Sequence, residues 1–244
     1  MSALSDFVVT ERELYAEKDK NLFAFSLGQA TSYYDFIPII VGRHQEESQK
    51  TVSNYTKLME SLSAQKSRSM TEEQIRIFEG GYRVSTQVHL EIESFYLFAK
   101  IFLDMIALFL LNYFGQARGI KLNSHDKLTK SYYEEYRLAK SLVFPERFVE
   151  SLMFLKEHVC DYRDKQISHL PNPRTIKGTV FNVSGQTRIA ATQLYPNAFD
   201  TQVESSELPV IVDAIDQYVQ QVIDVVRLNR ARTRYSLKEN DAIH

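Results

Sequence analysis

We expect an all-α protein, a helical bundle that carries one small β-hairpin. Apolar residues recur at spacings of three and four along most of the 244 residues, which is the period of an amphipathic helix. One segment, 174–194, breaks this pattern because it is rich in β-branched residues and contains the tight-turn signal Ser184-Gly185. With 44% hydrophobic residues, the chain can bury a large core.

The first segment, 1–70, is expected to form N-terminal helices packed on the bundle. From Glu11 to about Gln65 the pattern is helical but irregular, and Gly28 and Pro38 predict breaks in it. We therefore expect two helices here, one of them partly exposed.

The second segment, 71–244, is expected to hold the main helical domain and to form one compact unit with the first. Thr71-Glu-Glu-Gln74 has the form of a capping box, in which the threonine oxygen accepts a hydrogen bond from the Gln74 amide. A helix begins there, and its apolar phase continues to about Phe114-Gly115, where glycine favours a helix end.

Within that helix, the run from Phe95 to Phe114 raises the question of a membrane span. Lys100 and Asp104 interrupt it, and because they are four residues apart they can form an ion pair on one helical face. We expect a buried core helix and no membrane.

Three further helices complete the predicted bundle. Ser124 caps one that runs through Leu142, and Pro145 lies in the first turn of the next. That next helix must end at or before His169, because Pro171 and Pro173 forbid its continuation. The last helix begins after Ser205 or Ser206, with Pro209 in its first turn, and leads into four arginines within residues 227–234.

The end of the helix that follows Pro145 carries a candidate site: Arg163, the polar Asp164 and, after a gap of five residues, His169. The spacing alone carries no weight, because a chain with this many arginines and histidines gives about one such match by chance. Two more matches do occur, Arg83 with His89 and Arg118 with His125. On an ideal helix Arg163 and His169 would point roughly 120° apart, so one α-helix does not aim both at one atom.

The context of this motif resembles the HEPN superfamily. The apolar helix over 90–107, followed later by Tyr162-Arg-Asp-Lys-Gln-Ile-Ser-His169, is similar to the HEPN order of a long helix and then a helix that ends in arginine, a polar residue and histidine. The resemblance implies a metal-independent endoribonuclease in which paired subunits bring two motifs to one cleft. It implies that Arg163 binds the phosphate, His169 is the acid or base, and Asp164 orients one of them.

Basic residues near the motif are the candidate RNA ligands of this reading. They are Lys165, Arg174, Lys177 and Arg188. The partners expected are RNA, a second copy of the chain and an antitoxin or other protein. HEPN toxins that pair with a small nucleotidyltransferase carry a tyrosine two positions after the histidine, and the sequence departs from that variety at Pro171.

Two other readings remain open. The chain could be a noncatalytic HEPN-like module that binds a nucleotide, RNA or a protein. It could also be a structural bundle in which Arg163 pairs with Asp161, Asp164 or Glu157 and the match is accidental.

Composition limits the remaining classes. The net charge of −2 argues against a general nucleic-acid coat. The single cysteine, Cys160, excludes an internal disulfide and a multi-cysteine zinc site, and we expect it to be a small buried residue. We expect no metal and no cofactor, a cytoplasmic location, and a role in stress or phage defence that follows from the resemblance alone.

Overall fold

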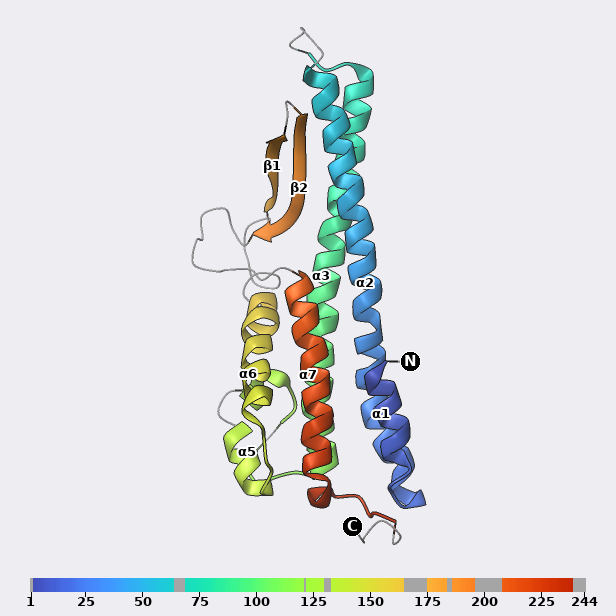
Figure 1. Ribbon diagram of the computed structural model, residues 1–244, viewed down its shortest axis with the longest axis vertical. Coiled ribbons are helices and arrows are strands. Elements are labelled where there is room, and N and C mark those ends of the chain that lie inside the picture. Colours follow the sequence, from blue (N-terminus) through green and yellow to red (C-terminus); the bar gives the residue numbers. More distant parts are fainter. Residues whose placement is uncertain are drawn as a thin grey trace. The chain divides into compact units, whose positions relative to one another are not determined.

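The structure, a computed structural model, describes residues 2–63, 69–120, 122–129, 133–164, 175–183, 186–195 and 208–238. The fold is all-α, as predicted from the apolar spacing (Figure 1). The helices are α1 (Ala3–Arg12), α2 (Glu17–Ser63), α3 (Glu72–Phe114), α4 (His125–Lys127), α5 (Tyr133–Lys140), α6 (Glu146–Leu155), the π-helix η2 (Lys156–Asp161), α7 (Leu208–Leu228) and the 3-10 helix η4 (Arg230–Arg232).

Two strands, β1 (Thr175–Val183) and β2 (Gln186–Tyr195), pair antiparallel. The pairing begins next to the connection, where Val183 lies opposite Gln186, and its register shifts between Gly178 and Thr179. The predicted turn at 184–185 lies outside the described residues. That this hairpin lies beside the candidate site stays a prediction.

The chain divides into two compact units, and α2 and α3 each contribute to both. Unit 1 comprises Met1–Ile37, Tyr96–Ser168 and Leu208–His244, and unit 2 comprises Pro38–Phe95 and His169–Glu207. The boundary predicted at residue 70 falls between α2 and α3, and it remains a prediction.

The predicted breaks at Gly28 and Pro38 are wrong, because α2 runs without interruption through both. A proline inside a helix removes one backbone hydrogen bond and costs about 3 kcal/mol. Burial on either side offsets this cost, since Ile37 and Ile40 are both buried. The real interruption lies between α1 and α2, where the Ala16 amide donates to the carbonyl of Ser236 at 2.8 Å.

The predicted start and end of α3 are confirmed. The Thr71 amide donates to Oε1 of Gln74 at 2.8 Å and the Gln74 amide donates to Oγ1 of Thr71 at 3.3 Å, which is a capping box. The helix ends before Gly115, whose φ of +82° lies in the left-handed region that favours glycine.

Buried residues recur at every seventh position along α3, a spacing typical of helices that pack lengthwise. They are Gln74, Gly81, Val88, Phe95, Phe102 and Phe109. The predicted ion pair between Lys100 and Asp104 forms at 2.7 Å. Among the described residues, α3 is the one helix long and apolar enough to cross a membrane, and 50% of its most apolar window is buried inside the protein.

A buried carboxylate joins the ends of unit 1. Glu11 on α1 is 2% exposed and accepts hydrogen bonds from the hydroxyls of Tyr15 at 2.7 Å and Tyr113 at 2.8 Å. Arg230 in η4 donates to both of its oxygens, from Nε at 3.1 Å and from Nη2 at 2.8 Å. The carboxylate therefore ties α1, α3 and the C-terminal segment together.

Replacing Glu11 by alanine is expected to lower the free energy of unfolding by about 3 kcal/mol, because two buried hydroxyls and a guanidinium lose their acceptor. Urea unfolding followed by circular dichroism measures this loss. The control is Glu13→Ala, which removes an exposed carboxylate two residues away and should leave stability unchanged. Equal losses in the two variants would contradict the structural role of Glu11.

Candidate functional site

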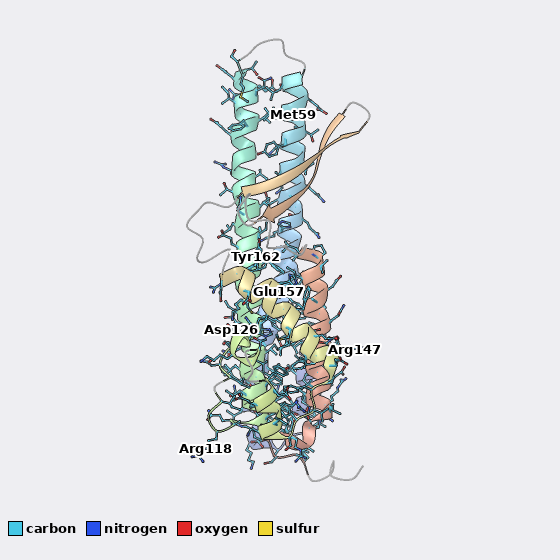
Figure 2. The ribbon with its side chains drawn as sticks, turned by 90° about the vertical axis from the view of Figure 1, so that its left-hand side faces the viewer. Met59, Arg118, Asp126, Arg147, Glu157 and Tyr162 are labelled. Atoms are coloured by element: carbon cyan, nitrogen blue, oxygen red, sulfur yellow. The ribbon has the colours of Figure 1, made fainter. Side chains whose placement is uncertain are left out.

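The segment that carries the candidate site begins as α6 and packs on α7. Pro145 occupies the cap position before α6, one residue earlier than predicted. The apolar residues expected to face inward are fully buried, namely Phe148, Leu152, Leu155 and Val159. Phe148 stacks on Tyr218 of α7 with ring centroids 5.6 Å apart. We call residues 146–164 the motif helix; Figure 2 labels Arg147, Glu157 and Tyr162 along it.

The motif helix changes its winding before it reaches Arg163. The sequence predicts an α-helix to its end, but from Lys156 to Asp161 it is a π-helix, a wider form that occurs frequently at functional sites. At the junction, the Lys156 amide is shared between the carbonyls of Leu152 and Met153. The α-helical prediction is therefore wrong over this stretch.

A histidine from another helix lies at the same junction. His125 of α4 is fully buried, and its Nε2 lies 3.1 Å from the carbonyl oxygen of Leu152. Because a carbonyl only accepts, Nε2 carries the hydrogen. Burial lowers the pKa of His125 to about 3, although the bond to Leu152 acts in the other direction.

Lys156, the first residue of the π-helix, is held by two carboxylates. Its Nζ lies 2.6 Å from Oδ1 of Asp161 and 2.9 Å from Oδ1 of Asp126, and its side chain is 15% exposed. These pairs raise the pKa of Lys156 against the opposing effect of burial, so the amine stays charged. The ion pairs connect the motif helix to the segment that carries His125.

Arg163 and Asp164 lie together at the described end of the motif helix. Nη1 of Arg163 donates to Oδ1 of Asp164 at 2.8 Å, and the two side chains are 32% and 44% exposed. The preceding residue, Tyr162, is buried and stacks on Tyr96 of α3 at 4.7 Å between ring centroids. The backbone is thus anchored directly before a guanidinium that solvent reaches.

The other predicted site residues lie either outside the described residues or on the hairpin. His169, Lys165 and Arg174 lie outside the described residues. Lys177 lies on β1 opposite Gln193, and Arg188 lies on β2 opposite Phe181. Their predicted contact with RNA stays a prediction.

The rival match of Arg118 with His125 does not form a site. Arg118 is exposed on a loop, whereas the ring of His125 is buried against the motif helix. Figure 2 shows Arg118 far from Asp126, the neighbour of that histidine. The arginines of 227–234 also differ from a free basic patch, because Arg230 binds the buried Glu11 and the Arg227 guanidinium lies 5.8 Å from the Phe7 ring centroid.

Sequence reasoning missed the roles of His125, Asp126 and Lys156. Ser124 was expected to cap the helix, and its Oγ does accept from the Lys127 amide at 3.3 Å. No local pattern indicates that the following residue, His125, is buried against the motif helix. The spacing of five between Lys156 and Asp161 gave no signal of their ion pair, since opposite charges at that spacing do not face each other on the expected α-helix.

Within the described residues, no group of three or more histidine, cysteine, aspartate or glutamate side chains could hold a metal ion. No family model, curated protein or solved structure matches this chain.

Cys160, the only cysteine, is buried in the motif helix, as expected for a small apolar residue. Burial raises the pKa of its thiol to about 12. We expect the native protein at pH 8 to react with a chromogenic disulfide reagent about a thousandfold more slowly than the urea-unfolded chain. Comparable rates in the two states would show that this part of the motif helix opens readily.

Acid should destabilise the protein through His125. Its pKa is about 3 when folded and about 6.5 when unfolded, so the unfolded chain binds more protons between these values. Stability is therefore lost as pH falls from 6.5 toward 3, by up to about 1.4 kcal/mol per unit from this residue. Urea unfolding between pH 7 and 4 should show a shallower fall for His125→Gln than for the wild type, and equal slopes would contradict the assignment.

Proposed function

We propose that this protein is a HEPN-like, metal-independent endoribonuclease that acts as a homodimer. The observation that carries the proposal is the state of Arg163: a partly exposed guanidinium on an anchored backbone, with Asp164 as its carboxylate partner at 2.8 Å. The structural alternative also predicts an ion pair of Arg163 with Asp164, so what supports the ribonuclease is that the Arg163 side chain is 32% exposed and that its partner is the next residue in the chain. In this position Arg163 is free to exchange solvent for a phosphate.

Arg163 and His169 would divide the chemistry of RNA cleavage between them. The 2′-hydroxyl attacks the adjacent phosphorus, the bond from phosphorus to the 5′-oxygen breaks, and a 2′,3′-cyclic phosphate and a free 5′-hydroxyl result. His169 moves a proton, accepting it at the attacking oxygen or donating it at the leaving oxygen. Arg163 stabilises the charge that develops on the phosphate.

Asp164 would orient the guanidinium. It lies directly after Arg163 and already accepts from Nη1, which leaves the remaining donors of the fork for a phosphate. The second copy of the chain would supply a second histidine, so that one accepts a proton while the other donates.

The proposal predicts that purified protein cleaves a labelled, unstructured RNA in EDTA and leaves 2′,3′-cyclic phosphate ends. Arg163→Ala and His169→Ala should each lower the cleavage rate at least 100-fold, because each removes a group that acts on the reacting atoms. Product ends are analysed by gel mobility before and after phosphatase treatment.

The chain offers a matched control with the same spacing. Arg83→Ala and His89→Ala change an arginine and a histidine that are also separated by five residues, and they should leave cleavage unchanged. Cleavage lost equally in both pairs, or retained in Arg163→Ala, would overturn the proposal. No cleavage by the wild type above the level of the variants would favour the noncatalytic binding module.

A further inference from the structure

The ion pair between Lys156 and Asp161 spans one turn of a π-helix. The two residues are five positions apart, and a π-helix closes its backbone hydrogen bonds over that same interval. On an α-helix, residues five positions apart point roughly 140° away from each other. A contact of 2.6 Å between these side chains is therefore compatible with the wide helix and not with the ordinary one.

Two more interactions hold the same junction from outside. Asp126 accepts from Nζ of Lys156 at 2.9 Å, and the neighbouring His125 donates to the carbonyl of Leu152, where the change in winding begins. Figure 2 shows Asp126 on the segment beside the motif helix. Lys156 is thus bound to Asp161 within the motif helix and to Asp126 on a second segment. The helix does not rewind without breaking these two ion pairs.

The second segment is itself fixed to α3. The His125 amide donates to Oδ1 of Asp104 at 2.8 Å, and Asp104 is paired with Lys100. Through these bonds the core helix α3 determines where Asp126 lies. The winding of the motif helix is thus tied to the centre of unit 1.

We propose that Lys156 is a positioning residue, which holds the motif helix in its π form and thereby sets the direction of Arg163. The inference rests on the proposed ribonuclease function, and it assigns to this function a residue outside the Arg163–His169 motif. Lys156 does not touch the reacting atoms in this scheme.

The change in winding has a large effect on direction. A π-helix advances by roughly 18° less per residue than an α-helix, so over the five steps from Lys156 to Asp161 the directions diverge by roughly a quarter of a turn. Because α6 is packed on α7, rewinding would pull Tyr162 off Tyr96 and turn Arg163 together with the end of the motif helix. The π form therefore decides which surface presents Arg163.

The structural test is the hydrogen-bond register of residues 156–161, measured by through-hydrogen-bond NMR couplings. In the wild type, the amide of Asp161 should couple to the carbonyl of Lys156, five residues earlier; in Lys156→Met and Asp161→Asn, it should couple to the carbonyl of Glu157, four residues earlier. Lys156→Arg should keep the wild-type register. Unchanged register in both Lys156→Met and Asp161→Asn would overturn the inference.

Lys20→Met is the matched control. The Lys20 side chain is 16% exposed and, like that of Lys156, lies near two carboxylates, Glu13 at 3.6 Å and Glu17 at 3.2 Å. It belongs to the same unit but not to the motif helix. A register change in this control as well would show that general loosening, not the loss of the Lys156 ion pairs, is responsible.

The functional test measures cleavage of the labelled RNA by the same variants. We expect Lys156→Met and Asp161→Asn to lower kcat at least tenfold with little change in KM, and Lys156→Arg and Lys20→Met to stay within twofold of the wild type. A changed register with full activity, or lost activity with an unchanged register, would overturn the positioning role. If the wild type cleaves no RNA, the proposed function fails, whereas the register measurement still decides whether Lys156 holds the π form.

Discussion

Burial of one face of α3, repeated at every seventh position from Gln74 to Phe109, is the constraint around which both units are built. In unit 1 this face is aromatic: Phe109 lies 6.2 Å from Phe23, and Phe102 lies 5.6 Å from Tyr34, between ring centroids. Each fully buried phenylalanine contributes about 2 kcal/mol or more. Apolar burial on this scale offsets the cost of local departures such as Pro38 within α2.

In unit 2 the same face is partly polar, and specific hydrogen bonds take the place of aromatic packing. Buried Glu91 accepts from Arg43 at 2.7 Å and from Gln87 at 2.7 Å, and buried Gln74 donates to Ser61 at 2.9 Å. Such pairs add little net stability, but they penalise any other alignment, because a shift would leave a buried group without a partner. In this unit the polar contacts between α2 and α3 therefore fix the alignment of the two helices more than they add to the free energy of unfolding.

Polar groups in unit 1 lie at joints between elements, where apolar packing alone does not fix a position. Asn229 donates to the carbonyl of Val143 and accepts from its amide, which holds the segment before α6 against the end of α7. Glu11 joins both ends of the unit, and Asp104 joins α3 to the segment that carries His125. These hydrogen bonds also fix the position of the motif helix, because α6 packs on α7 and Lys156 binds Asp126.

Features that depend on a few neighbouring residues could be predicted from the sequence. The capping box at Thr71, the glycine after Phe114, the ion pair of Lys100 with Asp104 and the inward face of α6 all arise within one or two helical turns. Other features depend on partners far along the chain: continuity of α2 through Pro38, burial of Glu11 against Arg230, and the donation from His125 that accompanies the π-helix. The sequence by itself determined the all-α class, both limits of α3 and the candidate Arg163, because local backbone preferences and apolar periodicity encode them. Only the tertiary structure decided how the motif helix is wound and what surrounds Arg163, because the contacts responsible join residues that folding alone brings together.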